Sequence, residues 1–437
     1  MSRPAAGAME AVLVGDLDVD APIPALERAG RYREARLLVR LHTRPVGEVV
    51  VPLSHDRLAP DRVVEAVWSQ LGDRIVDHMV VDQLPAPRML STAGLIDSPA
   101  PPCLERRSTM TVPSVTVMVA TRDRTESVLR CLKSLEALDY PSFDVVVVDS
   151  APSTPETERA LTGGHSWRYP FTYVRADRPG LAFAHNTALP AVTGEVVAFT
   201  DDDVQVDSHW LMALAEGFDD PAVTCVTGLI LAAELETPAQ LLLEQSGGFA
   251  RGYVERRFSL NNPPDDQLFP FTAGRFGSGA NMAFRTDWLR GHGGFDWATG
   301  AGTPARGGDD LLSFLHVILD GGDLVYQPAA ILRHWHRREY AGLRRQAFGY
   351  GVGLGSYLAA SACAQPSLVP VMLRRGVPAL RHMLGSASAK NRGRRPGFPS
   401  ELIWRERAGL VAGPFAYTAS RWRYRGTRDS TRQGADR

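Results

Sequence analysis

Cysteine is scarce in this chain of 437 residues, which has four cysteines and no Cys-x-x-Cys pair. This pattern excludes a disulfide-stabilised fold and argues against a thiolate zinc site. We therefore expect a reduced, cytoplasmic environment. The four are Cys103, Cys131, Cys225 and Cys363.

Long apolar runs are also absent. No stretch reaches the ~18 uninterrupted apolar residues typical of a membrane-spanning helix. The nearest, residues 350–372, is broken by glycines, Gln365 and Pro366. The first residues lack the apolar core of a signal peptide. These absences predict a chain that neither crosses a membrane nor is exported.

Lysine is almost missing, and arginine supplies nearly all the positive charge. The net charge is −1, yet residues 331–437 hold 20 Lys and Arg against 5 Asp and Glu. Such a basic region fits either an anionic partner, such as a phospholipid surface, a lipid phosphate or a nucleotide, or a solvated arginine-rich tail.

The composition, 44% hydrophobic and 22% charged, is that of a globular protein and excludes general disorder. The length predicts two or three modules. We expect a small α/β module at residues 1–95, with no residue that indicates chemistry, and a Pro- and Ser-rich linker at 96–112. A main domain at 113–340 and a basic, mostly helical region at 341–437 follow.

The main domain begins with a strand, an amphipathic helix and a second strand, which together predict a βαβ unit and a mainly parallel sheet. Ligands of such sheets bind at the carboxyl ends of the strands. Asp149 lies at one such end, and a later buried strand ends in Asp201, Asp202 and Asp203.

Three consecutive carboxylates after a buried strand need positive charge nearby. Mg²⁺ and Mn²⁺ are usually held by one or two carboxylates and substrate phosphates, so the triplet indicates a nucleotide diphosphate site. The alternative is an acidic turn that caps the next helix, but we expect Asp207 or Ser208 to provide that cap.

The ordered motifs VTVMVATRDR, VVVVDS, GEVVAFTDDDV and GGDD resemble the inverting family 2 glycosyltransferases. The resemblance covers residues 113–340. It implies the GT-A fold, a three-layer α/β/α arrangement with a mixed, mainly parallel sheet. The residues that it assigns to the nucleotide of the donor are Thr121, Arg122, Asp149, Asn186, Asp201 and Asp202.

By the same resemblance, Asp201 and Asp203 bind Mn²⁺ or Mg²⁺, and a histidine near residue 335 approaches the metal or the diphosphate. Of His334 and His336 we favour His336. The sequence departs from the family at residues 150–153, Ser-Ala-Pro-Ser, which leaves the base of the donor open. No Gln-x-x-Arg-Trp motif follows, which disfavours chain polymerisation.

The acceptor side is indicated by two segments. A glycine-rich turn is not a serine-hydrolase elbow, because Phe276 stands where glycine is required. It is either an ordinary tight turn or, by resemblance, part of the sugar and acceptor pocket through Gly277, Ser278, Gly279 and Asn281. The second segment holds Asp309 and Asp310, neighbouring carboxylates suited to a general base. By resemblance the base is Asp310, with Asp309 as the alternative.

Together these features predict a metal-dependent inverting glycosyltransferase that moves one sugar from a nucleotide-diphosphate-sugar to a hydroxyl acceptor. The acceptor is a glycan, a glycolipid or a small natural product, and a lipid-linked one would suit the aromatic and arginine-rich C-terminal segments. Those segments fit equally a peripheral position on the inner face of the plasma membrane or packing on the catalytic domain.

Two alternatives stay open. A sugar nucleotidyltransferase would usually have a glycine- and lysine-rich loop where residues 121–124 stand. A non-catalytic nucleotide- or carbohydrate-binding protein would tolerate the loss of Asp203 or Asp310. We expect no dinucleotide cofactor, since no strand precedes Gly-x-Gly-x-x-Gly, and no nucleic-acid partner.

Overall fold

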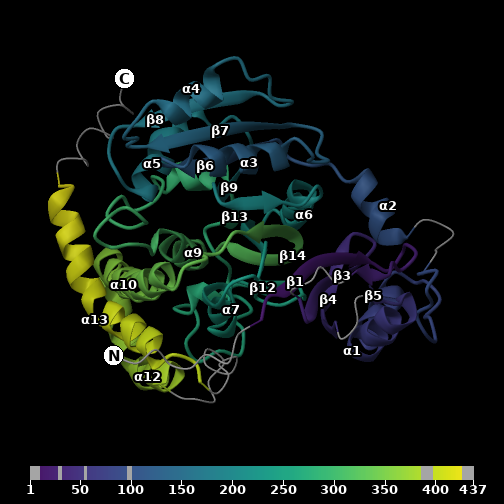
Figure 1. Cartoon of the computed structure of the whole chain (residues 1–437). Helices are drawn as coiled ribbons and strands as arrows, with labels where there is room; N and C mark the ends of the chain where they lie inside the picture. The colour runs from purple at the N-terminus through teal and green to yellow at the C-terminus, as the bar shows by residue number, and fades with distance from the viewer. Residues whose placement is uncertain (1–9, 28–31, 54–56, 96–100, 385–396, 426–437) are drawn as a thin grey trace.

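The structure is a computed structural model that describes residues 10–27, 32–53, 57–95, 101–384 and 397–425. Its centre is a nine-stranded sheet in the order β10-β14-β11-β13-β9-β6-β7-β8, with β12 paired to β14. Figure 1 shows this sheet between helices, with the N-terminal module at one side and the C-terminal helices along another.

The strands of the large sheet are β6 (Val115–Thr121), β7 (Phe143–Ser150), β8 (Phe171–Ala176), β9 (Val196–Asp201), β10 (Val204–Val206), β11 (Val223–Ala232), β12 (Arg256–Phe258), β13 (Asn281–Arg285) and β14 (Asp323–His334). The pairs β6/β7, β6/β9, β7/β8 and β11/β14 are parallel, whereas β13 runs antiparallel to β9 and β11. The sheet is therefore mixed, with a parallel half formed by β9, β6, β7 and β8, as expected.

Helices cover both faces of this sheet. They are α3 (Thr125–Leu135), α4 (Glu156–Thr162), α5 (Leu181–Ala188), α6 (Trp210–Gly217), α7 (Pro238–Gln245), α8 (Thr286–Gly291) and α9 (Asp309–Leu319), with short 3-10 turns η1 (Leu189–Ala191), η2 (Ala273–Arg275) and η3 (Pro366–Leu368).

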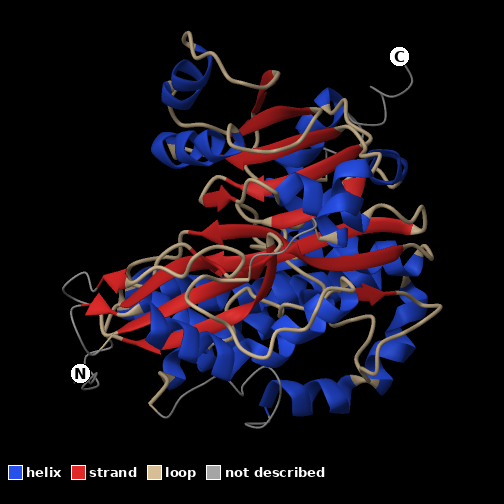
Figure 2. Cartoon of the chain, turned by 90° about the vertical axis from the view of Figure 1, so that its right-hand side faces the viewer, coloured by secondary structure: helices blue, strands red, loops and turns tan. Residues whose placement is uncertain are grey.

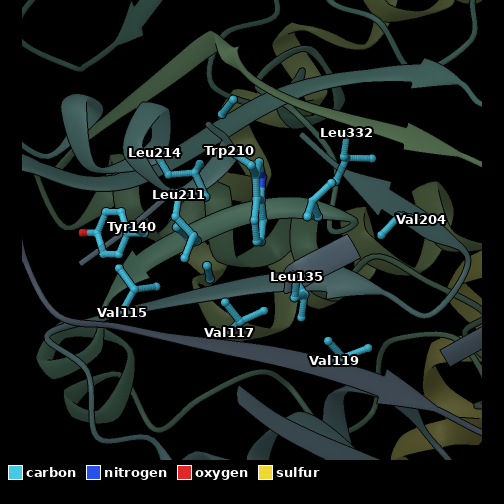
Figure 3. Close-up of a cluster of buried hydrophobic side chains, with 14 of the residues drawn as sticks. Val115, Val117, Val119, Leu135, Tyr140, Val204, Trp210, Leu211, Leu214 and Leu332 are labelled. Carbon is cyan, nitrogen blue, oxygen red and sulfur yellow. The ribbon is translucent and has the colours of Figure 1, made fainter. Parts of the chain in front are cut away.

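Alternate residues of each central strand enter different hydrophobic clusters, as the period of two in a strand requires. Val115, Val117 and Val119 of β6 pack with Trp210 of α6, as Figure 3 shows, whereas Met118 packs in the cluster on the opposite face. Both faces are buried, so the domain has three layers, α/β/α.

The N-terminal module is a three-stranded sheet, β1 (Val12–Asp18), β3 (Glu34–Leu41) and β4 (Arg44–Pro52), covered by α1 (Pro60–Val81). A small pair, β2 (Leu26–Glu27) and β5 (Arg57–Leu58), completes it. Proline at the start of α1 suits a helix N-terminus. The helix buries Val63, Val67, Leu71 and Ile75, whereas Val64 and Trp68 are only partly covered.

The segment predicted as a linker contains a helix, α2 (Pro102–Thr109), whose Cys103 is buried. The sequence had indicated only an irregular Pro- and Ser-rich stretch. Its two proline residues at positions 101 and 102 act as helix-start residues, which the composition alone did not reveal.

The module packs against the β11/β14 side of the large sheet, on the side away from β8 in Figures 1 and 2. Leu38 of β3 is buried with Leu229 and Ile331. Arg40, nearly buried, forms ion pairs with Asp207 at 2.7 Å and with Asp16 at 3.2 Å. Apolar packing and buried charge together hold the module to the main domain.

The C-terminal helices are α10 (Tyr340–Ala364), α11 (Val369–Arg374), α12 (Gly376–Leu384) and α13 (Ser400–Arg423). α10 and α13 pack at close range, since a Cβ on Gly355 would lie 2.3 Å from the Leu410 carbonyl oxygen and one on Gly413 would lie 2.5 Å from Gly355 Cα. In the part of the chain that the structure describes, no helix is long and apolar enough to cross a membrane.

Candidate functional site

The carboxyl ends of β7, β6 and β9 meet at one edge of the large sheet. Thr121 on β6 lies beside Asp149 on β7, and Ala120 lies beside Asp201 on β9. This is the edge at which α/β sheets bind ligands. The structure therefore brings together Thr121, Asp149 and Asp201, three of the residues that the sequence indicated for donor binding.

Asp202 and Asp203 are buried and tied down by one arginine. Asp202 accepts hydrogen bonds from Thr121 Oγ1 at 2.8 Å and from Arg124 at 2.5 Å, and Arg124 also donates to Asp203 at 2.7 Å. Sequence reasoning missed Arg124, although it lies in the TRDR run that ends β6. Both Asp202 oxygens therefore already accept a hydrogen bond from the protein.

Asp149 keeps an acceptor for a ligand. Its Oδ2 accepts a hydrogen bond from the Tyr173 hydroxyl at 3.1 Å, while its buried Oδ1 has no hydrogen-bond partner among the described residues. A buried carboxylate oxygen without a donor is costly, so a donor from a bound molecule would satisfy it. Arg122, at the same strand end, is about half exposed.

A carboxylate-rich set of ligands lies beside these strand ends. Asp201, Asp203 and His334 each offer one ligand atom, and the three atoms lie within 4.8 Å of one another. His334 ends β14 and is paired with Val204, the residue after the triplet, which sets its Nε2 3.2 Å from Asp203 Oδ1. Two carboxylate oxygens and one imidazole form a donor set that fits Mn²⁺ or Mg²⁺.

His336 lies one step farther from the carboxylates than His334. Its Nε2 contacts Glu244 Oε1 at 3.1 Å, and its Nδ1 faces His334 Nδ1 at 3.0 Å. The geometry therefore favours His334, rather than the His336 that the sequence favoured, as the candidate metal ligand. The local His-x-His pattern does not reveal which histidine lies beside the carboxylates, because this is set by the pairing of β14 with β10.

The Asp309 and Asp310 pair begins α9. Gly308 before them has φ of +91°, and a Cβ there would lie 2.8 Å from the Gly353 carbonyl oxygen, so glycine is required. Asp310 Oδ2 accepts a hydrogen bond from the Gly279 backbone N–H at 2.8 Å. The glycine turn and the carboxylate pair, separate in sequence, thus form one unit.

Two asparagines that the sequence indicated as ligand contacts form hydrogen bonds within the protein. Asn281 is fully buried, accepts from Trp210 Nε1 at 2.8 Å and donates to the Leu229 and Ala330 carbonyl oxygens, so it ties strands together rather than lining a pocket. Asn186 uses both side-chain polar atoms on the backbone of Phe295, at 2.7 and 2.8 Å. The sequence could not distinguish these amides from ligand-binding ones.

Residues 116–293 match the family model described as glycosyl transferase family 2. The chain contains a family 2 glycosyltransferase domain. Together with the mixed sheet and its two helical layers, this match confirms the predicted GT-A fold.

Relatives of the glycosyltransferase domain include a pre-mycofactocin glycosyltransferase of Mycobacterium tuberculosis, 29% identical over 239 residues, which are 54% of this chain and 46% of that protein. A succinoglycan biosynthesis protein, ExoM, of Rhizobium meliloti is 31% identical over 30% of this chain and 45% of its own length. The chain spans about half the length of the curated relatives it matches.

Among solved structures, the mannosyltransferase PcManGT from Pyrobaculum calidifontis, in complex with GDP-Man and Mn²⁺, superposes with a TM-score of 0.41 at 20% identity. The superposition covers 76% of this chain and 85% of that one.

The glycosyltransferase domain has a pocket of about 940 Å³ that begins at its acidic residues. Asp201, Asp309 and Asp310 line it, together with the turn at 277–279. Much of the remaining wall is apolar: Phe249 and Phe271 come from loops, Leu354 and Leu358 from α10, and Met372 from α11. The C-terminal helices therefore complete a pocket whose acidic part belongs to the family 2 domain.

Burial and neighbouring charges shift the pKa values of the carboxyl groups at and beside this pocket in opposite directions. Burial raises the pKa of Asp309, Asp310 and Asp201, and that of Asp202 to about 6. Burial also acts on Asp203, but its hydrogen bond with His334 and the charges of His334 and Arg124 outweigh it and lower the pKa. Asp203 is thus held as a carboxylate, while the carboxyl pair on α9 is biased towards accepting a proton.

Proposed function

We propose that the chain is a metal-dependent, inverting glycosyltransferase that moves one sugar from a nucleotide-diphosphate-sugar to a hydroxyl acceptor. The proposal rests on one observation. Asp201, which could bind a metal together with Asp203 and His334, lines the same pocket as Asp310. In inverting transfer, a metal site must lie beside the leaving diphosphate and a general base beside the attacking hydroxyl, on opposite sides of the reacting carbon.

The nucleoside would bind at the carboxyl ends of β6 and β7. The free Oδ1 of Asp149 suits an N–H of the base or a ribose hydroxyl, and Thr121 and Arg122 flank it. Asp201, Asp203 and His334 would hold Mn²⁺ or Mg²⁺ against the diphosphate. When bound, the ion supplies stabilisation of the negative charge that develops on the departing diphosphate.

Asp310 would act as general base. It takes the proton of the acceptor hydroxyl as that oxygen bonds to the anomeric carbon and the bond to the diphosphate breaks, with inversion at the carbon. Asp310 is only partly buried, whereas Asp309 is 5% exposed and faces the loop at Gly300. The Gly279 N–H fixes the Asp310 carboxylate, which leaves Asp310 as the better placed of the two.

The apolar wall of the pocket favours an acceptor with a hydrophobic part, such as a lipid-linked one. Apolar surface removed from water supplies binding free energy of roughly 25 cal/mol per Å². On α13, Trp404, Phe415 and Trp422 are between 66% and 75% exposed, beside arginines that suit an anionic surface. We infer a peripheral position on the inner face of the plasma membrane, which vesicle co-sedimentation with and without anionic lipid tests.

The experiment for the reaction compares the wild type with Asp310→Asn. The variant should keep metal-dependent donor affinity and lose transfer by on the order of 10²–10⁴-fold, because only the base is removed. Release of nucleoside diphosphate from a sugar nucleotide measures transfer, and calorimetry measures donor binding. Asp309→Asn is the matched control and should retain more activity. Full turnover of Asp310→Asn would refute the assignment, and donor binding without turnover by the wild type would favour a non-catalytic protein.

A further inference from the structure

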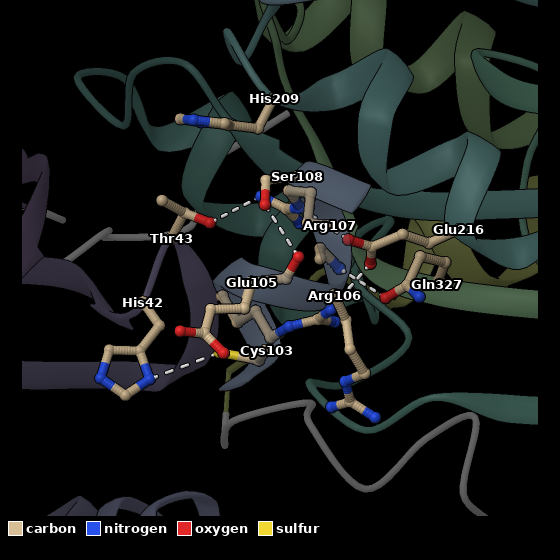
Figure 4. Close-up of polar contacts among 12 residues, drawn as sticks. His42, Thr43, Cys103, Glu105, Arg106, Arg107, Ser108, His209, Glu216 and Gln327 are labelled. Carbon is tan, nitrogen blue, oxygen red and sulfur yellow. Dashed lines mark hydrogen bonds and ion pairs between the residues drawn. The ribbon is translucent and has the colours of Figure 1, made fainter. Parts of the chain in front are cut away.

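Four polar side chains converge in the N-terminal module, for which the sequence indicated no chemistry. His42 follows β3, His78 lies in the last turn of α1, Asp82 caps that helix, and Cys103 lies in the first turn of α2. His42, Asp82 and Cys103 are between 1% and 3% exposed. Figure 4 shows the His42 ring directed at Cys103 beneath α2.

The four ligand atoms are His42 Nδ1, His78 Nε2, Asp82 Oδ2 and Cys103 Sγ. The two nitrogens lie 3.1 Å apart, and Asp82 Oδ2 lies 3.1 Å from His42 Nδ1 and 3.3 Å from His78 Nε2. Cys103 Sγ lies 3.5 Å from His42 Nδ1 and 3.9 Å from His78 Nε2. All four atoms, the remaining pair of Asp82 Oδ2 and Cys103 Sγ included, lie within 4.8 Å of one another.

These five separations are compared with the edges of a zinc-sized tetrahedron. With metal–nitrogen and metal–oxygen bonds of about 2.0–2.1 Å and a metal–sulfur bond of about 2.3 Å, tetrahedral angles require edges of roughly 3.3 Å between N or O atoms and roughly 3.6 Å to sulfur. The distances match within a few tenths of an ångström. Hydrogen bonding alone requires only that atoms contact one another in pairs. It does not explain why four potential metal-ligand atoms gather so closely.

The ligand types select the ion. One thiolate, two imidazoles and one carboxylate suit Zn²⁺, whereas Mg²⁺ and Ca²⁺ prefer oxygen-only sets. Four protein ligands in a buried position leave no open place for a substrate, which is the pattern of a structural site. The ligands come from two helices and a turn, so a bound ion would join segments that are far apart in the sequence.

We propose that His42, His78, Asp82 and Cys103 form a structural Zn²⁺ site that fixes α2 to the N-terminal module. The site lies at the junction with the glycosyltransferase domain. Arg107 of α2 donates to Thr43, the neighbour of His42, at 2.7 Å and to Glu216 of α6 at 2.6 Å, as drawn in Figure 4. Arg44 also donates to Glu216, at 2.8 Å. The ion would set the position of α2 and, through it, these contacts between the two parts.

The test measures the metal content of the full chain after dialysis against a chelator. The wild type should retain one zinc per chain. Cys103→Ser should lose it, while Cys363→Ser, which changes an exposed cysteine, should keep it. Asp203→Ala should also keep it, because that variant alters only the acidic cluster of the glycosyltransferase domain. None of these readouts requires glycosyl transfer, so the outcome is independent of the proposed reaction.

X-ray absorption of the wild-type zinc protein covers the case in which Cys103→Ser does not fold. The expected spectrum has one sulfur at about 2.3 Å and three nitrogen or oxygen ligands at about 2.0–2.1 Å. Replacement by Co²⁺ should give a thiolate charge-transfer band. A folded wild type that holds no zinc and gives no such band with Co²⁺ would overturn the proposal, as would a first shell without sulfur or equal zinc retention in Cys103→Ser.

Discussion

The acidic cluster of the glycosyltransferase domain and the histidine and cysteine cluster of the N-terminal module contrast in chemistry and in access. Asp201, Asp203 and His334 are rich in oxygen, and Asp201 lines a large pocket. The cluster around Cys103 combines nitrogen, sulfur and oxygen and is closed by α1 and α2. The first arrangement suits an ion shared with a substrate, and the second suits an ion that stays.

The two clusters also differ in what holds them before any ion binds. Arg124 already supplies positive charge to Asp203, so part of the negative charge of the acidic cluster is offset by the protein. At the other cluster, Arg106 is 3.9 Å from Asp82 and is largely exposed. In the acidic cluster, protein charges therefore hold the aspartates in place before an exchangeable ion binds. In the cluster around Cys103, the inferred structural ion would itself hold the ligands together.

Among the changes that compare the two clusters, the largest effect should come from Asp203→Ala. It removes a metal ligand and leaves Arg124 without one of its partners, so transfer should fall on the order of 10³-fold, from several kcal/mol of lost charge stabilisation. Steady-state kinetics at saturating Mn²⁺ measures it. Unchanged kinetics in this variant would contradict the role of Asp203 in transfer. A simultaneous loss of zinc would contradict the independence of the two clusters.

Asp207→Ala should destabilise the contact between the module and the domain by about 3 kcal/mol, because it strips nearly buried Arg40 of a partner. Asp16 remains bound to Arg40 and keeps the effect at the low end of the range. The matched control is Glu27→Ala, whose pair with Arg57 is exposed and worth ~0–1 kcal/mol. Urea unfolding compares them, and equal losses in the two variants would contradict the buried docking contact.

His334→Ala and His336→Ala sharpen the assignment within the acidic cluster. His336→Ala should weaken Mn²⁺ binding about 10-fold, because it removes a group that orients His334, and His334→Ala should weaken it further, because it removes the ligand atom. Titration of Mn²⁺ in the presence of donor measures both affinities. A larger loss in His336→Ala would restore the order that the sequence suggested.

The smallest effect is a displacement of the pH profile. Because burial raises the pKa of Asp310, this base is protonated at a higher pH than an ordinary aspartate of pKa ~3.9. The rate kcat/KM should therefore fall on the acid side at a higher pH than the pKa of an ordinary aspartate, since the protonated form cannot accept the acceptor proton. A profile that stays flat down to pH ~4 would speak against Asp310 as the base.

Stability should respond to pH through a different carboxyl. Burial raises the pKa of Asp207, but hydrogen bonds from His209 and the charge of Arg40 outweigh it and lower the pKa to about 2. Its contribution is therefore complete above the unfolded value of ~3.9 and disappears as pH falls towards 2. Asp207→Ala should flatten this part of the stability curve, and an unchanged slope would exclude the contribution.

The residues that could be predicted from the sequence are those that follow a strand or begin a helix. The triplet at 201–203, Asp149 and the pair Asp309 and Asp310 are encoded by contiguous patterns, and the ends of parallel strands must meet at one edge. The layers of the large sheet followed from the same strand and helix alternation. These parts of the fold rest on local periodicity, which a single sequence reveals.

What the sequence did not reveal depends on tertiary pairing. Arg124 reaches the triplet only because β6 and β9 are neighbours. Asn281 forms hydrogen bonds with strands that are distant in the chain. The ligands around Cys103 come from a turn and two helices, one of which falls in a stretch that resembled a linker. The absence of Cys-x-x-Cys argued against a zinc site, but it excludes only sites with that spacing.

The central claim is that the carboxyl edge of β7, β6 and β9 binds a nucleotide together with a divalent ion. The direct test is the thermal midpoint with UDP, GDP, dTDP, CMP or ADP, each with and without Mn²⁺. A ligand at 100 times its Kd adds about 2.7 kcal/mol to the free energy of unfolding. We predict that one nucleotide raises the midpoint only when Mn²⁺ is present, and that Asp203→Ala abolishes the rise. A folded protein whose midpoint no nucleotide changes with Mn²⁺ would contradict the account.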